Sequence, residues 1–268
     1  MAADWFIDEI TAAVAPLLPG FGVEVVAEID STNPELMRRA RAGRDAPVLL
    51  VAERQTAGRG RLGRPWQSAQ QQAQPASLTF SLGLPLVPRD WSGLSLAVGV
   101  SVAESLDPAA HGGLALKWPN DLWVRDRKLG GILIETALPQ APQGGAASRY
   151  LVIGIGLNLD AREADGLSTP PAWLREWRPD ATAAGVLRDM VPPLVRTVLE
   201  FGTQGFLPFA ERFAARDALR GREVQLSDGT VGLCEGVGWT GELRVKTAEG
   251  LQQISSSEVS VRPRRPNA

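Results

Sequence analysis

Cysteine and histidine are almost absent from this chain, which has one residue of each, Cys234 and His111. A single cysteine cannot form an internal disulfide, and the two residues together offer too few ligands for a zinc site. We expect Cys234 to lie in the core of a small β-barrel, because an unpaired cysteine behaves as a small apolar side chain. His111 stands beside two glycines and is expected in a surface loop.

An excess of either charge is also missing. The chain has 28 Lys and Arg against 30 Asp and Glu, so no general basic field would attract nucleic acid. No apolar run is long enough to cross a bilayer, and residues 1–20 carry acidic groups where a signal peptide carries basic ones. With 268 residues and 44% hydrophobic content, the sequence predicts a soluble cytoplasmic protein with one substantial core and a small second domain.

Strand and helix patterns fill most of the chain up to residue 217. A short helix is predicted to start with a cap at Thr32 or Asn33, to have Pro34 at its first position and to end near Gly43. Other helices are expected at 92–106, 182–201 and 205–216, and strands at 22–30, 47–55, 77–86, 114–124, 128–136 and 150–159. We expect Ser92 to cap the first of these helices, and Pro192-Pro193 to bend or split the second.

The pattern changes near residue 218. Only short strand candidates follow, separated by glycine-containing turns, at 223–227, 230–237, 242–247, 251–255 and 258–262. Strands this short bury little surface unless the sheet closes on itself, which favours a small SH3-like barrel. The sequence therefore predicts two domains, residues 1–217 and 218–268.

The most informative segment is GRGRLGRPW, residues 58–66, which formally matches the dinucleotide-binding pattern GxGxxG. That interpretation fails because Pro65 and a Gln-rich run follow where a helix should start, and no acid stands at the expected spacing. Glycines let backbone amides approach a ligand, and Arg59, Arg61 and Arg64 supply donors for carboxylate or phosphate. A solvated basic surface loop is the simpler alternative.

Three further motifs stand downstream of this loop: KWPND (117–121), RKLGGILIE (127–135) and GIGLN (154–158). Each one alone has an ordinary structural explanation. The first is a turn, the second is a hairpin arm with a close approach, and the third is a buried strand with a glycine bulge.

Together and in this order, these motifs resemble the catalytic domain of biotin–protein ligases. The resemblance adds DSTN (30–33) and QTAGRGR (55–61), is strong over about residues 25–160, and continues weakly to EVSVR (258–262). It implies an α+β fold, in which a mixed sheet backed by helices, of the class II synthetase-like type, precedes a small SH3-like barrel.

The resemblance implies a reaction in two steps. Biotin carboxylate attacks the α-phosphate of ATP to give biotinyl-5′-AMP and pyrophosphate, with Mg²⁺, and a lysine of a biotin carboxyl carrier protein then displaces AMP. The first step brings two anions together, so fixed cations lower its barrier and no protein nucleophile is needed.

The resemblance also implies roles for individual residues. The catalytic residues would be Arg61, Lys128 and Asp121. Biotin would contact Ser31, Thr32, Asn33, Gln55, Gly58, Arg59, Arg61, Lys128 and Gly131, with Ser31, Thr32 and Gln55 at its ureido group. ATP would contact Arg61, Arg64, Trp66, Lys117, Asn120, Lys128, Asn158 and Arg262.

Three of these roles have alternatives. Trp66 is expected as a stacking surface near adenine or else as ordinary core. Asp121 would bind Mg²⁺ or help to deprotonate the acceptor lysine. Lys117 would contact ATP or only pair with Asp121.

Two departures from the family pattern qualify the resemblance. Only 29 residues precede Asp30, too few for the winged helix-turn-helix of some members, so we expect the monofunctional type without specific DNA binding. The Gln-rich stretch 67–75 is longer than expected and leaves the wall of the biotin pocket undefined.

Rival functions remain at this stage. A lipoate–protein ligase shares the fold and reaction type, a non-catalytic sensor would bind biotin or nucleotide without turnover, and a DNA-binding regulator fits the charge poorly. The sequence leaves both a monomer and a homodimer open.

Overall fold

The structure is a computed structural model that describes residues 5–67, 70–71, 74–138, 149–162, 167, 169–255 and 260–264. The chain forms two compact units, each built from two separate stretches: 1–87 with 127–196, and 88–126 with 197–268. The boundary predicted between residues 217 and 218 falls inside the second unit and stays a prediction.

The first unit is built on a mixed sheet, as predicted. Its strands lie in the order β1 (Gly22–Ile29), β2 (Val48–Gln55), β5 (Ser77–Leu86), β9 (Arg149–Asn158) and β8 (Arg127–Ala137). The first two strands are parallel, and the remaining neighbours in this series are antiparallel. All five strands fall within about a residue of their predicted bounds.

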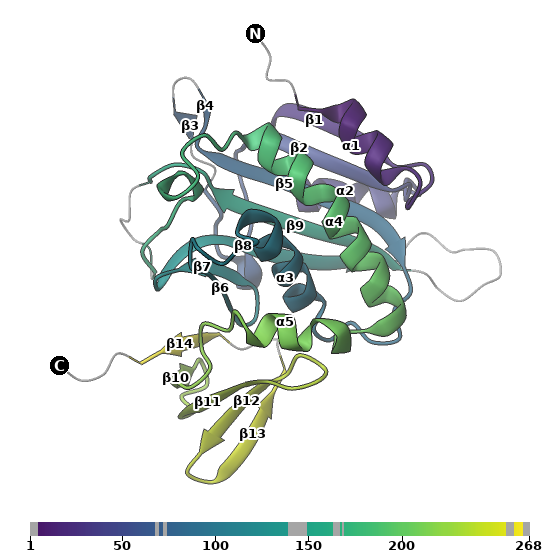
Figure 1. Cartoon of the computed structure of the whole chain (residues 1–268). Helices are drawn as coiled ribbons and strands as arrows, with labels where there is room; N and C mark the ends of the chain where they lie inside the picture. The colour runs from purple at the N-terminus through teal and green to yellow at the C-terminus, as the bar shows by residue number, and fades with distance from the viewer. Residues whose placement is uncertain are drawn as a thin grey trace. The chain divides into compact units, whose positions relative to one another are not determined.

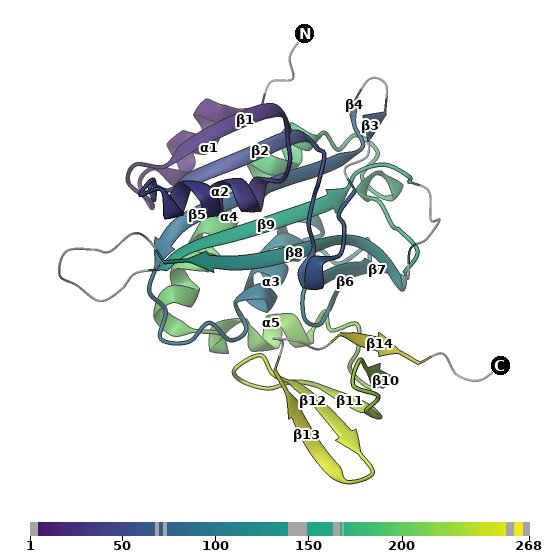
Figure 2. The same cartoon turned by 180° about the vertical axis from the view of Figure 1, so that it is seen from behind.

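Helices cover both faces of this sheet. The helix α2 (Thr32–Arg41) lies on the face turned toward the viewer in Figure 2, while α1 (Ile7–Val14) and the start of α4 (Ala183–Gln204) lie on the other face (Figure 1). The apolar side of α2 is packed on the sheet through Leu36, Met37 and Ala40, which meet buried side chains such as Tyr150 and Val152. This packing holds the start of α2 over the strands.

The cap predicted for α2 is wrong. Ser31 is the N-cap, with extended backbone, and its side chain makes no capping hydrogen bond. The backbone N–H of Thr32 donates instead to Oε1 of Gln55 at 2.8 Å, so a side chain from β2 satisfies a donor that a local cap would take. Pro34 is consequently the third helical residue rather than the first. Gly43 follows the helix end with φ 76°, as predicted.

Ahead of its C-terminal strands, the second unit contains α3 (Leu94–Leu106), the strands β6 (Leu114–Lys117) and β7 (Asp121–Val124), and the short helices η3 (Leu207–Phe209) and α5 (Ala210–Ala214). The single strand predicted at 114–124 is therefore wrong, because β6 and β7 are an antiparallel hairpin with the KWPND turn between them. Trp118 of this turn is fully buried and donates its indole N–H to the Gly241 carbonyl at 3.0 Å.

One more helix prediction needs correction, and one of the two alternatives offered for a second helix is wrong. Gly93, with φ 80°, precedes α3 in place of Ser92, because the Phe206 ring leaves no room there for a β-carbon. The helix α4 is not split, although Pro192 and Pro193 lie inside it. Burial of its apolar side outweighs the lost backbone donors, since the following residues Leu194, Val195, Val198 and Phe201 are all fully buried.

The C-terminal strands of the second unit form an antiparallel sheet, as predicted. The order is β13 (Gly250–Ile254), β12 (Leu243–Thr247), β11 (Val231–Val237), β10 (Glu223–Leu226) and β14 (Val261–Pro263). Closure of this sheet into a barrel stays a prediction. Cys234 is fully buried, and burial raises the pKa of its thiol to about 11.

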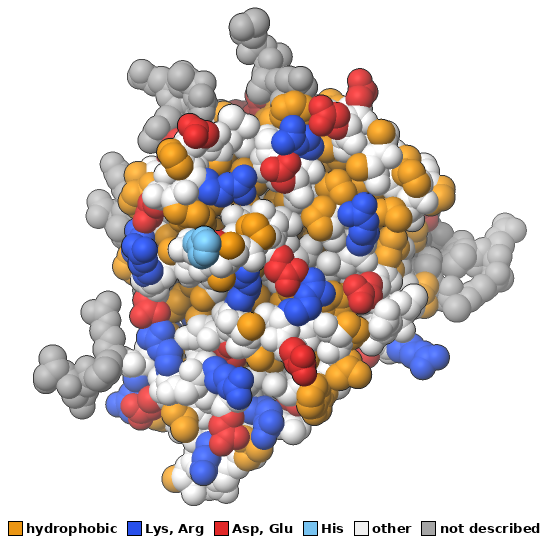
Figure 3. All heavy atoms as spheres, in the orientation of Figure 1, with side chains coloured by type: hydrophobic (Ala, Val, Ile, Leu, Met, Phe, Trp, Pro, Cys, Tyr) orange, Lys and Arg blue, Asp and Glu red, His pale blue; other side chains and the backbone are white. Residues whose placement is uncertain are grey.

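Charges of both signs are interspersed on the face drawn in Figure 3, in agreement with the balanced composition. His111 is exposed, as predicted. None of the helices in the described part of the chain is long and apolar enough to span a membrane.

Asp217 of the second unit has a carboxyl group that is only partly satisfied by the described residues. Its Oδ1 accepts a hydrogen bond from the Leu219 backbone at 2.8 Å, whereas Oδ2 is buried without a hydrogen-bond partner among the described residues. Burial raises the pKa of Asp217, against the opposing effects of the backbone hydrogen bonds and of the Arg220 charge.

We expect Asp217→Asn to remove a pH-dependent loss of stability. A carboxyl whose pKa is raised in the folded state contributes its stability fully below the unfolded pKa and loses it as the pH rises through the folded pKa. Between about pH 4 and pH 8, the wild type should therefore lose melting temperature relative to Asp217→Asn. Thermal unfolding across that range measures the difference, and parallel curves for the two proteins would contradict the assignment.

Candidate active site

The start of α2 carries three buried polar residues, Ser31, Thr32 and Asn33, each less than 5% exposed. All three were predicted to contact biotin. Their proximity to the sheet requires a bare backbone on β9, because a β-carbon on Gly154 would lie 2.2 Å from Oδ1 of Asn33. Gly154 therefore admits the Asn33 side chain onto the sheet.

Thr32 and Asn33 form a hydrogen-bonded cluster with partners from three strands. Gln55 accepts from the Thr32 backbone N–H at 2.8 Å and lies 3.2 Å from the Thr32 hydroxyl. The Asn33 amide donates to the Leu133 carbonyl at 3.2 Å and to Glu135 at 2.9 Å. The hydroxyl of Ser81, on β5, lies 2.6 Å from both Thr32 Oγ1 and Asn33 Oδ1. Such satisfaction is what burial of polar groups requires.

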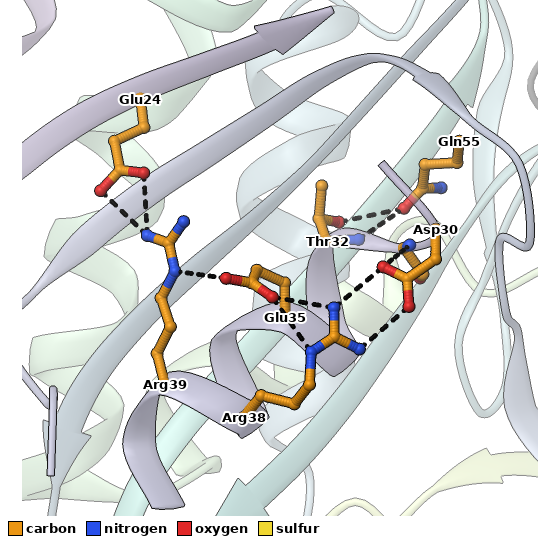
Figure 4. Close-up of polar contacts among 8 residues, drawn as sticks. Glu24, Asp30, Thr32, Glu35, Arg38, Arg39 and Gln55 are labelled. Carbon is orange, nitrogen blue, oxygen red and sulfur yellow. Dashed lines mark hydrogen bonds and ion pairs between the residues drawn. The ribbon is translucent and has the colours of Figure 1, made fainter. Parts of the chain in front are cut away.

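A network of charged side chains holds the outer side of α2 (Figure 4). Arg38 bonds Asp30 at 2.9 Å and Glu35 at 2.8 Å, and Arg39 links Glu35 to Glu24. Hydrogen bonding from Arg38 is the main cause that lowers the pKa of Asp30, whose carboxylate also accepts from the Ser31 N–H at 2.8 Å. The first residue of the DSTN motif thus orients the turn into α2, through exposed ion pairs of modest strength.

The glycine–arginine loop closes on itself. The Gly60 N–H donates to the Arg64 carbonyl at 2.7 Å, and the Trp66 N–H donates to the Gly58 carbonyl at 2.8 Å. Between them lies a short turn, η1 (Arg61–Gly63), in which Leu62 has φ 56°. A β-carbon on Gly58 would lie 2.5 Å from the Trp66 carbonyl, so the base of the loop requires glycine.

The three arginines of this loop differ in exposure: Arg59 and Arg64 are exposed, whereas Arg61 is partly buried. Lys128, on β8, is also partly buried, and its backbone N–H donates to the Pro170 carbonyl at 2.8 Å. The neighbouring Gly131 pairs with Gly156 across the sheet. The roles predicted for these residues toward biotin or ATP stay predictions.

Trp66 rests on the sheet where β9 has its second glycine. A β-carbon on Gly156 would lie 2.5 Å from the Trp66 ring, and the guanidinium of Arg162 lies 5.9 Å from the centre of that ring. The indole N–H of Trp66 is buried and has no hydrogen-bond partner in the described part of the chain. Trp66 as a whole is only half-buried, which distinguishes it from a core tryptophan such as Trp118.

Asn158 connects the region around the Trp66 ring, here called the Trp66 corner, to β8. Its amide donates to the Lys128 carbonyl at 3.2 Å and to the Ala172 carbonyl at 3.0 Å, while its oxygen accepts from Arg162 at 3.2 Å. Arg162 also donates to the Gln67 side chain at 2.9 Å. Trp66, Asn158 and the backbone of Lys128 are therefore brought together around Arg162, which burial makes less basic by lowering its pKa.

Four of the predicted site residues belong to the second unit: Lys117, Asn120, Asp121 and Arg262. Lys117 pairs with Asp121 at 3.7 Å and lies 5.1 Å from the centre of the Trp123 ring. Lys117 therefore pairs with Asp121 in this structure, while the contacts predicted between ATP and Lys117, Asn120 and Arg262, and the role predicted for Asp121, stay predictions.

The described residues contain no group of three or more His, Cys, Asp or Glu side chains that could hold a metal ion. The carboxylate of Asp121 already faces the Lys117 ammonium, so these side chains form no cage for a divalent cation. Magnesium is commonly held by one or two carboxylates together with substrate phosphates, and Asp121 could at most supply one such ligand.

Two residues of the candidate site were missed from sequence. Ser81 bridges Thr32 and Asn33, and the alternation of Ser77, Thr79 and Ser81 on a buried strand was the available signal. Arg162 stands four residues after Asn158, but nothing in its spacing indicated a contact with Trp66.

Residues 25–158 match the family model described as the biotin/lipoate A/B protein ligase family. The biotin–[acetyl-CoA-carboxylase] ligase of Mycobacterium tuberculosis is 40% identical over 144 residues, covering 51% of this chain and 49% of that relative. The chain thus spans about half the length of that protein. The ligase of the same name from Paracoccus denitrificans is 31% identical, over 88% of this chain and 98% of its own length.

Two other relatives extend the likeness. The bifunctional ligase/repressor BirA of Escherichia coli is 32% identical, over 91% of this chain and 75% of its own length. The solved biotin protein ligase of Aquifex aeolicus, in complex with biotin and ATP, is similar with a TM-score of 0.73 and 29% identity, covering 90% of this chain and 99% of that one. These matches confirm the resemblance indicated by the motifs: the chain belongs to the biotin/lipoate A/B protein ligase family.

Proposed function

We propose that this chain is a biotin–protein ligase, which forms biotinyl-5′-AMP from biotin and ATP and transfers biotin to a lysine of a carrier protein. The single observation that carries the proposal is the arrangement of the first unit. There, a buried polar cluster at the start of α2 and the Trp66 corner both rest on β9, through Gly154 and Gly156. The names of the relatives and solved structures described above support biotin and ATP as the two substrates.

The choice of biotin over lipoate depends on the polar residues at the start of α2, which would contact the ring of the ligand. The cluster of Ser31, Thr32, Asn33 and Gln55 offers hydroxyl and amide groups. A cyclic urea is a flat set of donors and an acceptor that such groups can recognise, whereas the dithiolane ring of lipoate has no hydrogen-bond donor. The dithiolane ring would gain no hydrogen bond from these groups, whereas a cyclic urea could exchange several with them.

The catalytic task of the site is electrostatic. Biotin carboxylate must approach an α-phosphate that is also negative, and opposite unit charges at 4 Å are worth about 4 kcal/mol at a protein-like dielectric. Arg61 and Lys128, both partly buried, are the cations that we assign to this task. Partial burial reduces solvent screening, so each cation should act more strongly than an exposed one.

The Trp66 corner is the proposed nucleotide end. The Trp66 ring is half-buried and can stack on adenine. Arg162 lies near this ring and donates a hydrogen bond to the Asn158 side chain, which therefore lies in the same corner. The buried indole N–H of Trp66, which has no partner among the described residues, supports a role beyond core packing.

Several finer points belong to the same proposal. Magnesium would be held mainly by the ATP phosphates, with Asp121 as one protein ligand or as an aid to the acceptor lysine. The acceptor would be a biotin carboxyl carrier domain. The protein would act in the cytoplasm, and we expect it not to bind specific DNA. Both a monomer and a homodimer fit this function.

Incubation with ATP, Mg²⁺, biotin and a biotin carboxyl carrier domain tests the function directly. The carrier should gain the mass of one biotin only when all components are present, and parallel incubation with lipoate should leave its mass unchanged. Labelling by lipoate alone would identify a lipoate ligase. Ligand binding without any gain in mass would indicate a sensor.

Arg61→Gly is expected to loosen retention of the adenylate. Loss of the guanidinium removes a donor to the acyl phosphate, so biotinyl-5′-AMP should leave the site and label lysines of bystander proteins. The ratio of bystander to carrier labelling, measured by mass spectrometry, should rise about tenfold, which corresponds to roughly 1.4 kcal/mol of lost interaction. Arg89→Gly, at an exposed loop arginine, is the matched control and should behave as wild type.

Lys128→Gln is expected to slow the first step rather than to prevent biotin binding. Loss of one fixed cation near the reacting anions should lower biotin-dependent pyrophosphate exchange by about 100-fold. The control Arg54→Gln removes an exposed cation that pairs with Glu28 on the neighbouring strand, and it should change the rate by less than about twofold. Equal rates for Lys128→Gln and the control would contradict the assigned role.

A further inference from the structure

The glycine–arginine loop is attached to the first unit by a glutamine on either side of it. Gln55, ahead of the loop, accepts a hydrogen bond from the Thr32 backbone N–H at 2.8 Å. Gln67, directly after the loop, is bonded by Arg162, whose guanidinium donates to the Gln67 side-chain oxygen at 2.9 Å and to its backbone carbonyl at 3.4 Å. The loop is therefore tied to the start of α2 on one side and to the chain just beyond β9 on the other.

The guanidinium of Arg162 has two further contacts. It donates to Oδ1 of Asn158, the last residue of β9, at 3.2 Å, and it lies 5.9 Å from the centre of the Trp66 ring. A guanidinium suits these contacts, because it has five N–H donors in one plane and a flat face that stacks on aromatic rings. One side chain thus contacts both the end of the loop, at Trp66 and Gln67, and the end of β9.

Trp66 has little polar attachment of its own outside the loop. Its backbone N–H donates to the Gly58 carbonyl at 2.8 Å, which closes the loop on itself, and none of the described residues bonds its indole N–H. The ring packs on the bare backbone of Gly156, a contact without direction that leaves a flat ring free to slide or tilt. Arg162 supplies the directional contacts that connect this end of the loop to β9.

We propose that Arg162 is a positioning residue for the nucleotide, which holds the Trp66 ring over Gly156, where that ring would stack on adenine. The bonds of Arg162 to Gln67 are exposed and the bond to Asn158 is partly buried, so each contributes modestly. The attachment at Gln55 does not involve Arg162, so biotin binding should not depend on it. This inference rests on the proposed function and adds a residue that serves ATP through Trp66.

Arg162→Met keeps an apolar stem and removes every donor, so the Trp66 ring should spend less time over Gly156. The KM for ATP in biotin-dependent pyrophosphate exchange should rise about 5- to 10-fold, while kcat stays near that of wild type because saturating ATP restores the stack. Biotin affinity, measured by calorimetry without ATP, should change by less than about twofold. Arg162→Lys should recover little of the loss, because an ammonium keeps the charge but lacks the flat face and the forked donors.

A double-mutant cycle with Trp66→Leu tests whether Arg162 acts through the ring. Once the ring is gone, Arg162→Met should have nothing left to disturb, so the double variant should show about the same KM for ATP as Trp66→Leu alone. The matched control is Arg188→Met in the same unit. Arg188 also lies over an aromatic ring, 4.7 Å from the centre of Phe6, so its loss removes a similar contact and should leave the KM for ATP unchanged.

The outcomes separate the inference from the proposed function. Full recovery by Arg162→Lys, or additive losses in the double variant, would mean that the charge of Arg162 attracts ATP directly, and the positioning role would be overturned. An unchanged KM in Arg162→Met, an equal rise in Arg188→Met, or an equal loss of biotin affinity would overturn it as well. If the wild type forms no biotinyl-5′-AMP from biotin and ATP, the proposed function is wrong and this inference falls with it.

Discussion

Two glycines on one face of β9 give the candidate site its floor. Residues two apart on a strand point to the same side, and Gly154 and Gly156 leave that side bare. Asn33 from α2 occupies the space over the first glycine, and the Trp66 ring occupies the space over the second, each closer than any β-carbon would allow. The two glycines of the GIGLN motif have no side chains, and this lets two distant segments rest on one strand.

The segments on this floor differ in chemistry. Around Asn33 lie hydroxyl and amide groups whose hydrogen bonds are almost entirely internal, so that end is rigid and selective. Around Trp66 lie an aromatic face, the Arg162 guanidinium and the Asn158 amide. The glycine–arginine loop runs between Gln55 and Trp66, which brings Arg61 into the chain segment that joins the two ends. This order of groups along the chain suits two anionic ligands, one of which has a polar ring at its far end.

Much of this arrangement could be predicted from sequence, for identifiable reasons. Strands 22–30 and 47–55 could be predicted because β-branched runs favour strands, strand 77–86 because its residues alternate, and the motif set identified the family. The start of α2 was misjudged because Gln55, 23 residues away, supplies the partner that a local cap would otherwise provide. The single strand predicted at 114–124 ran across KWPND, although that motif by itself indicated the turn that separates β6 from β7.

The remaining gaps have the same physical origin. Ser81 and Arg162 act through contacts between segments far apart in the chain, and residue spacing carries no information on such contacts. The roles of Arg61, Lys128 and Asp121 toward ligands depend on atoms that belong to those ligands. The pairing of Lys117 with Asp121 could be offered as an alternative from sequence, because the two residues flank a turn of three residues.

The most direct test of the account separates the two glycines. Gly154→Ala should weaken biotin affinity and leave the KM for ATP nearly unchanged, while Gly156→Ala should raise the KM for ATP and leave biotin affinity nearly unchanged. Overpacking of this kind costs about 1–3 kcal/mol, so each specific effect should reach about tenfold. Gly22→Ala, where an added β-carbon meets nothing within 4 Å, is the control and should alter neither quantity. If both floor variants impaired both ligands equally, or neither ligand at all, the division of one strand between two binding ends would be wrong.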